Sequence, residues 1–176
     1  MAQRPIRVLG DPVLRSVCRE VESFDQGLAS LVTDLEETVA NPGRAGLAAN
    51  QIGVVRRVFS WNIDGEVGHI VNPAIEVEEG EQDDEEGCLS IPGIYYPCQR
   101  AEFVRARGFD RHGDEVVVEG HGLMARCIQH EVDHLNGHLF IDRLTGPVRQ
   151  QAMREVRQLS AAAPTDGQAT PSSLWR

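Results

Sequence analysis

QHEVDH, residues 129–134, places two imidazoles four positions apart, with a carboxylate directly after the first. In a helix, His130 and His134 lie on one face one turn apart, so together they can bind a single metal ion. Glu131 can then reach a water on that ion. The stretch therefore predicts a helical metal site, and because catalytic metals usually have three protein ligands, a third ligand must come from elsewhere.

The helix that carries this motif is expected over residues 123–136, since Asn136-Gly137 is a strong termination signal. A second amphipathic helix is predicted from Gln26 to Ala40, where apolar residues recur at helical spacing. A third helical pattern covers Val148 to Leu159.

Short strands are predicted in the middle of the chain, where β-branched and aromatic residues are punctuated by Gly, Pro and Asn. They are expected over residues 54–62, 69–77, 101–110 and 115–120. The eight acids among the eleven residues from Glu76 to Glu86 are interpreted as the solvated end of a hairpin. These elements predict an α+β fold in which antiparallel β-sheets pack around a central HExxH-bearing helix, with an N-terminal helix and a C-terminal helix.

Composition limits the classes of protein that remain. With 176 residues, 41% hydrophobic and 25% charged, we expect one domain over residues 1–160 and a flexible tail over residues 161–176. The net charge of −10 argues against DNA binding, which needs a basic surface. No stretch has the pattern of a signal peptide or a membrane span, so we expect a cytoplasmic protein without a membrane partner.

The third ligand has two candidates when only residue types are considered. The four cysteines, Cys18, Cys88, Cys98 and Cys127, are expected to be reduced and therefore available to a metal. Cys88 lies in EGCLSIPG, a tight segment, and is either packing or a ligand. Glu155, on the last helical pattern, could instead complete a site with two histidines and one glutamate.

Three motifs in a fixed order add a family resemblance. GLAANQIG (46–53), EGCLS (86–90) and QHEVDH (129–134) resemble the three signature motifs of peptide deformylase. VLGDPVLR near the N-terminus also looks like this family, and the resemblance extends to about Leu144. It implies a metal-dependent hydrolase that removes the formyl group from formyl-methionyl nascent polypeptides and releases formate.

The resemblance also implies the catalytic residues. Cys88, His130 and His134 would bind one divalent ion, which is typically Fe²⁺ in this family, although Zn²⁺ or Ni²⁺ can occupy the same ligands. Glu131 would act first as base and then as acid. The side-chain amide of Gln51 and the backbone N–H of Leu89 would stabilise the developing oxyanion.

Substrate binding is implied in the same way. Gly46 and Gly87 would let the peptide run alongside as an added strand. Glu86 is expected to be buried and paired with Arg100, unless it simply ends the acidic run. The residues matching the family's substrate site are Arg44, Ala45, Gly46, Glu86, Gly87, Leu123, Arg126 and Cys127, with His130 beside them.

Two positions depart from the family pattern. Arg44 stands where the first motif usually has a glycine, so the loop must differ if that glycine is needed for its backbone conformation; Gly43 could take over the role. Tyr95 stands where some members have an arginine that contacts the peptide beyond methionine. Neither position is a ligand or an oxyanion donor. Asp133 is interpreted either as a residue that orients a histidine or an arginine, or as a solvated helix residue.

Two other functions remain open at this stage. A zinc endopeptidase would use Glu155 as third ligand, and a non-enzymatic homologue would keep the metal for binding alone. A contact with ribosomal RNA through the C-terminal helix is a further hypothesis, because Arg149, Arg154 and Arg157 are basic residues in an acidic chain. The alternative is an ordinary solvated helix face.

Overall fold

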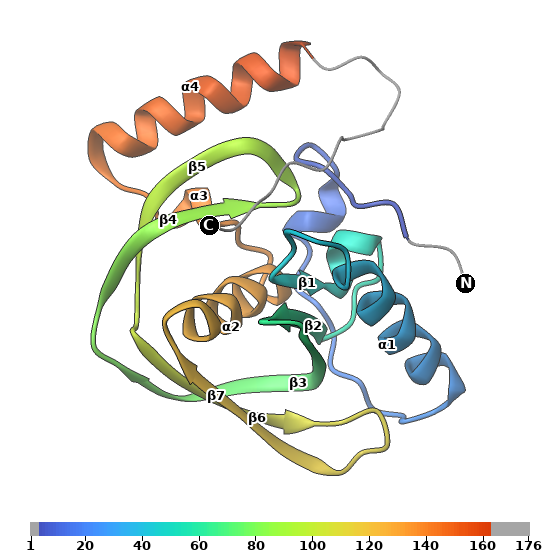
Figure 1. The fold of residues 1–176 in the computed structure, drawn as a ribbon. Coiled ribbons are helices and arrows are strands. Elements are labelled where there is room, and N and C mark those ends of the chain that lie inside the picture. Colours follow the sequence, from blue (N-terminus) through green and yellow to red (C-terminus); the bar gives the residue numbers. More distant parts are fainter. Residues whose placement is uncertain (1–3, 163–176) are drawn as a thin grey trace.

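The computed structural model describes residues 4–162. Figure 1 shows one helix, α2, at the centre, with a two-stranded sheet on one side and a larger sheet on the other. The elements in chain order are η1 (Pro12–Arg15), α1 (Gln26–Val39), β1 (Gly46–Ala48), η2 (Ala49–Ile52), β2 (Val58–Ile63), β3 (Glu66–Glu79), β4 (Gln82–Cys88), β5 (Ile91–Arg100), β6 (Phe103–Phe109), β7 (Glu115–His121), α2 (Gly122–Leu135), α3 (Phe140–Arg143) and α4 (Gly146–Ala162).

The predicted α+β class is confirmed. The larger sheet has five strands in the order β1-β2-β3-β6-β7, and the smaller one pairs β4 with β5. All of these pairings are antiparallel. The QHEVDH stretch lies in the second half of α2, so the predicted central helix carries the motif.

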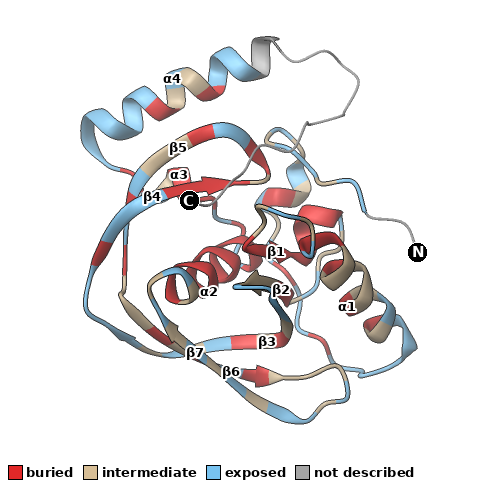
Figure 2. Ribbon diagram, in the orientation of Figure 1, coloured by how far each residue is buried: buried red, intermediate tan, exposed pale blue. Residues whose placement is uncertain are grey.

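The apolar face of α2 is buried against the larger sheet. Ile128 and Leu135 of the helix share a core with Phe59, Ile70 and Val104 of the strands, and all five are fully buried. Figure 2 shows most of α2 in the colour of buried residues. Because helix positions 130 and 134 are turned away from this core face, the two histidines point toward β4. Burial of the apolar face thus fixes the direction in which the histidines point.

Helix α1 covers the side of the larger sheet near β1, as Figure 1 shows. Its first turn is capped by Asp25, whose Oδ1 accepts a hydrogen bond from the N–H of Leu28 at 3.0 Å. Its buried residues pack on Leu47, Val58 and Val71. The observed bounds agree with the predicted helix to within one residue.

A third core lies between the small sheet and the C-terminal helices. Ile94 and Cys98 of β5 pack against Phe140 of α3 and against Ala152 and Val156 of α4. Helix α4 begins two residues before the predicted start and continues to Ala162, so the first two residues of the predicted tail are helical. Residues 163–176 lie outside the described part.

The interpretation of the acidic run as a hairpin end is wrong. Strand β3 continues to Glu79 and pairs with β6, whereas β4 pairs with β5. The chain therefore crosses from one sheet to the other at Gly80, which has a φ of +67°. Strand β5 was not predicted, because Pro92 and Pro97 argue against a strand; it pairs only with β4, and prolines are tolerated where one strand edge is free.

The other predicted strands are found with shifted ends. Strand β2 begins four residues later than expected, and β3 is longer at both ends. Within residues 4–162, no helix is long and apolar enough to cross a membrane. The four cysteines are all free and buried, as expected for a reduced protein.

Candidate metal centre

Three predicted ligands converge between α2 and the end of β4. The Sγ of Cys88 lies 3.2 Å from Nε2 of His134, which lies 3.2 Å from Nε2 of His130. All three donor atoms are within 4.8 Å of one another, and all three residues are buried. This is the one such group of His, Cys, Asp and Glu side chains among residues 4–162.

The donor set fits a single divalent ion. A tetrahedral ion with usual Zn–N and Zn–S bond lengths separates its ligand atoms by roughly 3.3 to 3.6 Å, close to the spacings found here. The chemistry agrees as well, since a thiolate and two imidazoles suit zinc, iron and nickel. Both imidazoles turn Nε2 toward the centre of this donor set, since Nε2 of His134 faces both Sγ of Cys88 and Nε2 of His130.

Glu155, the alternative third ligand, lies elsewhere. It is on α4, where its Oε1 accepts a hydrogen bond from Nε2 of Gln151 at 3.2 Å, and it interacts with the hydroxyl of Tyr96 on β5. The described residues therefore bring Cys88, and not Glu155, to the two histidines.

The end of β4 presents Cys88 through an irregularity in strand pairing. The register slips between Gly87 and Cys88, and Cys88 is opposite Ile91. The ring of Tyr95 fills the space next to Gly87, since a β-carbon there would lie 2.5 Å from its Cε1. The backbone N–H of Ser90 points back to Cys88 Sγ at 3.4 Å. The turn after β4 thus holds the sulfur toward the helix.

Glu131 is buried beside the ligands, with only 1% of its surface exposed. Its Oε2 has no hydrogen-bond partner in the described part. Burial raises the pKa of Glu131 to about 7. A carboxyl with this pKa and a free oxygen is suited to exchange protons near neutral pH.

Gly46 leaves room for that carboxylate. A β-carbon at position 46 would lie 2.3 Å from Oε1 of Glu131 and 2.8 Å from Sγ of Cys127. The space that the missing side chain provides is therefore occupied by Glu131, whatever the path of a bound peptide.

The side-chain amide of Gln51, on η2, is held by hydrogen bonds at both its oxygen and its nitrogen. Its Oε1 accepts a hydrogen bond from the N–H of Ala48 at 2.8 Å, and its Nε2 donates to the hydroxyl of Ser90 at 3.1 Å. Nε2 also lies 3.7 Å from Sγ of Cys88. The predicted oxyanion donor thus borders the ligand cluster, and Leu89, the other predicted donor, lies in the chain between Cys88 and Ser90.

Sequence reasoning missed Ser90 as part of this arrangement. It is fully buried and touches both Gln51 and Cys88. It missed Asn50 too, whose Nδ2 donates to the carbonyl of His134 at 2.6 Å. Both residues lie inside the recognised motifs, so their place in a motif was the available signal.

Glu86 is the centre of a buried charge cluster, as expected from its predicted pairing with Arg100. Arg100 donates from Nε and Nη2 to the two carboxylate oxygens at 2.9 and 2.6 Å. Arg126 Nη1 adds a bond at 2.9 Å, and Nδ1 of His130 lies 2.6 Å from Oε1. Burial alone would raise the pKa of Glu86, but the hydrogen bonds of His130 and Arg100 outweigh it and hold that pKa well below the ordinary value.

This cluster orients His130, one of the predicted ligands. Because Nδ1 of His130 faces Glu86, Nε2 is the nitrogen directed at the other ligands, which is the usual arrangement for a metal-binding histidine. Asp133 is also buried and binds two arginines, Arg100 and Arg143. Of its two predicted interpretations, the structure therefore agrees with contact to an arginine.

The remaining predicted substrate residues lie in the first half of α2 and in the segment that leads into β1. Cys127 is buried, with Sγ 3.4 Å from the carbonyl of Ala45. Leu123 is 39% exposed at the start of the helix. Arg44 points to the end of α1, where Nη1 donates to the carbonyl of Thr38 at 2.6 Å. Gly43, with a φ of +78°, takes the left-handed conformation, so Arg44 in the glycine position needs no unusual backbone.

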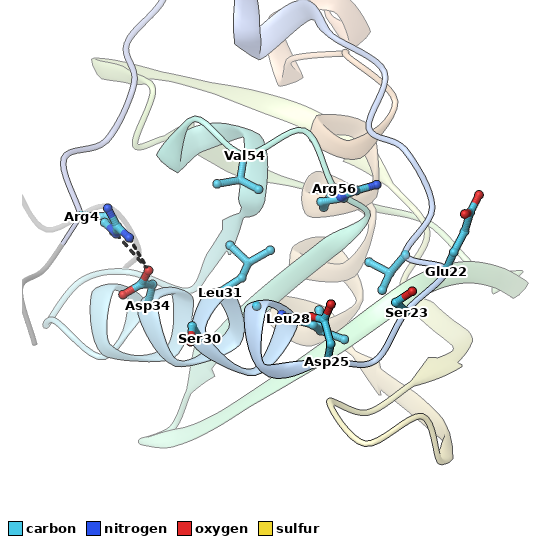
Figure 3. A pocket seen from close by; sticks show the side chains of 12 residues that line it. Arg4, Glu22, Ser23, Asp25, Leu28, Ser30, Leu31, Asp34, Val54 and Arg56 are labelled. Carbon is cyan, nitrogen blue, oxygen red and sulfur yellow. Dashed lines mark hydrogen bonds and ion pairs between the residues drawn. The ribbon is translucent and has the colours of Figure 1, made fainter.

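A separate depression of about 530 Å³ lies outside the first half of α1 (Figure 3). Leu28, Leu31 and Val54 line it together with charged side chains, and Arg4 pairs with Asp34 at one end. None of the predicted site residues lines this depression.

Comparisons with known proteins find relatives that match most of the chain, both in sequence and in structure. The family model described as polypeptide deformylase matches residues 3–150. A peptide deformylase of Acidothermus cellulolyticus is 52% identical over 165 residues, covering 94% of this chain and 92% of the relative. The crystal structure of a peptide deformylase from Legionella pneumophila superposes with a TM-score of 0.83 at 43% identity, covering 93% of this chain and 100% of that one. A plant peptide deformylase structure gives a TM-score of 0.85 at 31% identity, over 92% and 91% of the two chains.

Proposed function

Because the chain belongs to the peptide deformylase family of hydrolases, which remove N-terminal formyl groups and use a single divalent metal, we propose that it deformylates nascent polypeptides beginning with formyl-methionine and releases formate. One observation carries this proposal. Cys88, His130 and His134 place three donor atoms around one point, and the free carboxylate of Glu131 follows His130 in the same helix. The cytoplasm, where nascent chains are made, is the proposed location.

Cys88, His130 and His134 would hold the ion. When bound, the ion supplies a Lewis acid that lowers the pKa of water and polarises a carbonyl. We propose Fe²⁺ as the physiological ion, while Zn²⁺ and Ni²⁺ suit the same donors. Iron in a thiolate site is exposed to oxidation. Activity of the iron form should therefore decay in air and that of the nickel form should persist; equal decay of both forms would argue against iron chemistry.

Glu131 moves the proton. Its free Oε2 accepts a proton from the attacking water, and the carboxyl then delivers that proton to the leaving amine nitrogen. A pKa of about 7 lets the same group act as base and then as acid at neutral pH. Gly46 gives this carboxylate its space.

Negative charge on the formyl oxygen is stabilised by donors that are already in place. The Nε2 amide of Gln51 is held by Ser90 while its oxygen is held by Ala48, so the amide does not have to reorient. The backbone N–H of Leu89 is the second proposed donor.

The methionine side chain is proposed to lie beside the first turns of α2. Leu123, Ala45 and Cys127 supply apolar contacts, and Glu86 with Arg126 form the wall behind them. Gly87 and Tyr95 lie where the small sheet meets this region, and a peptide could add to its backbone there. Arg44 would contribute at the edge, through its position next to Ala45.

The decisive experiment measures formate release from formyl-Met-Ala-Ser by anaerobically prepared iron enzyme, with Glu131→Ala as the comparison. The proposal expects turnover by the parent protein and its loss in the variant, with metal content retained. No turnover by the loaded parent protein would instead favour a homologue that uses its metal for binding.

We also propose that α4 contacts ribosomal RNA, since Arg149, Arg154 and Arg157 are exposed along it. Ala152 and Val156 of the same helix belong to the third core, so the helix should not be deleted in a test. Replacing the three arginines by glutamate should weaken ribosome binding while formate release from a free peptide is unchanged. If the triple variant binds ribosomes as tightly as the parent protein, the proposed contact is wrong.

A further inference from the structure

A continuous series of charged side chains runs from the protein surface to the metal centre. Arg143 of α3 binds Asp133 through Nε at 2.9 Å and through Nη2 at 2.5 Å. Asp133 accepts a further bond from Nη1 of Arg100 at 2.7 Å, and Arg100 binds both oxygens of Glu86. Oε1 of Glu86 lies 2.6 Å from Nδ1 of His130. We refer to these five residues as the charge chain.

The inner members of the charge chain are withdrawn from water. The side chains of Glu86, Arg100 and Asp133 are 0%, 1% and 5% exposed. Arg143 is the outer end, with 52% of its side chain exposed. Buried charges are tolerated only when they are paired with good geometry, so each inner member depends on its neighbours.

The guanidinium and carboxylate groups of the charge chain are planar, and each one restricts the orientation of the group it bonds to. Arg143 supplies two of the three side-chain hydrogen bonds to Asp133 and bonds to both carboxylate oxygens, so it sets the plane of that carboxylate. The carboxylate in turn holds Nη1 of Arg100, whose Nε and Nη2 fix Glu86. Glu86 then fixes the ring of His130.

We propose that Arg143 is a positioning residue for the metal centre, acting through Asp133, Arg100 and Glu86 to hold the ring of His130 in its ligating orientation. Arg143 touches neither the ligands nor the reacting atoms, so its effect passes through the charge chain. This inference rests on the proposed function in one respect, namely that His130 is a metal ligand.

The test uses Co²⁺ as a visible probe of ligand geometry. The parent protein, Arg143→Met, Arg143→Lys, Asp133→Asn and the double variant Arg143→Met with Asp133→Asn are loaded with Co²⁺. Their absorption spectra and their rates of metal loss to excess chelator are compared. Failure of the parent protein to bind Co²⁺ would count against the proposed function, whereas equal spectra and rates in all variants would count against the charge chain alone.

Mutation of a residue that hydrogen-bonds a metal ligand typically lowers metal affinity or activity by about 10 to 100-fold. Arg143 is more distant and half-exposed, so we expect Arg143→Met to lose Co²⁺ to the chelator about three to ten times faster than the parent protein. The Co²⁺ absorption should change as well, and Arg143→Lys should recover part of both effects. In the Asp133→Asn background, Arg143→Met should add much less than it does in the parent protein, because an amide at position 133 carries no charge and keeps one acceptor oxygen, so the link to Arg100 is already weakened.

Two control variants distinguish the positioning role of Arg143 from a general loss of stability. Arg107 is 49% exposed and pairs with Glu76 on the larger sheet, so Arg107→Met should leave the Co²⁺ spectrum unchanged. Arg15 binds Asp142, the neighbour of Arg143 on α3, so Arg15→Met loosens α3 without touching Asp133. An Arg15→Met effect as large as that of Arg143→Met would overturn the proposal, as would fully additive effects of Arg143→Met and Asp133→Asn.

Thermal unfolding of each variant shows whether it folds. If Asp133→Asn does not fold, the ranking of Arg143→Met, Arg143→Lys and Arg15→Met decides the matter. A rate of metal loss in Arg143→Met that equals that of the parent protein contradicts the proposal on its own.

Discussion

Gly46 and Glu131 are in contact across the site: a β-carbon on Gly46 would lie 2.3 Å from Oε1 of the carboxylate. The glycine comes from the short strand β1 and the glutamate from α2, so the first and third motifs meet at this point. Because of this contact, a residue with a side chain at position 46 would overlap with the carboxylate of Glu131 in its observed position.

The substitution Gly46→Ala should therefore displace the carboxylate of Glu131, the proposed catalytic group. A misplacement on the order of 1 Å can reduce rates by about a hundredfold, and we expect kcat to fall by that order while metal content is unchanged. Formate release and metal analysis of the same preparation check this. A variant with parental kcat would show that Glu131 does not need its observed position.

Ser90→Ala should act on Gln51, the proposed oxyanion donor. Without the hydroxyl, Nε2 of Gln51 loses its partner at 3.1 Å and the amide is free to turn. We expect about a tenfold loss of kcat, less than the roughly 10²-fold or greater loss typical when a donor itself is removed. Leu89→Ala is the companion variant, because its backbone N–H remains. It should keep much of its activity, and a larger kcat loss in Leu89→Ala than in Ser90→Ala would contradict this assignment.

Activity should depend on the protonation of Glu131. Burial raises the pKa of this carboxyl to about 7, so below that pH the group carries a proton and cannot act as a base. We expect kcat/KM to fall on the acid side of about pH 7, with the midpoint lower if the positive charge of the ion stabilises the carboxylate. A profile that is flat on the acid side would exclude Glu131 as the base.

Glu86 should make stability depend on pH in the acid range. The pKa of its carboxyl is held below the ordinary 4.5, so the unfolded chain takes up this proton more readily than the folded one. The stability it contributes is present above about pH 4.5 and is lost as the pH falls below that value toward the lowered pKa. Glu86→Gln should lose this contribution.

The cost of Glu86→Gln is expected to be about 3 to 5 kcal/mol at neutral pH, because Arg126 would keep a buried charge without its carboxylate and Arg100 would keep only Asp133 as its acidic partner. Urea unfolding of both proteins at neutral and acid pH measures the difference. An equal pH dependence in the two proteins would show that another group is responsible.

Local sequence signals predicted the elements that depend on neighbouring residues. Helix α2 was expected over residues 123–136 and is found from Gly122 to Leu135, because the Asn136-Gly137 signal that ends it is local in the sequence. Gly137 has a φ of +77°, and a β-carbon there would lie 2.7 Å from the carbonyl oxygen of Arg15. A glycine is therefore required at the end of this helix.

The small sheet could not be predicted in the same way. Strand β4 is rich in acids that face solvent, and only Gln82, Glu86, Gly87 and Cys88 are buried within it. The apolar residues of the small sheet share a core with α3 and α4, which are distant in sequence. Local β-propensity carries no information on such contacts.

For the site residues, too, local sequence signals were enough for some and not for others. Residue types and spacing were enough to propose His130, His134 and Glu131 as site residues. The preference for Cys88 over Glu155 needed either the family resemblance or the structure, which places Cys88 beside the two histidines. Ser90 acts on Gln51 across 39 residues, and such a contact cannot be recognised from one sequence.

The claim that Cys88 completes the metal site is tested most directly by metal stoichiometry. Parent protein, Cys88→Ala and Glu155→Ala are loaded with the same ion and analysed after removal of excess metal. We predict one ion per chain in the parent protein and in Glu155→Ala, and loss of the ion in Cys88→Ala. Retention of a full ion by Cys88→Ala together with its loss from Glu155→Ala would contradict the site described above.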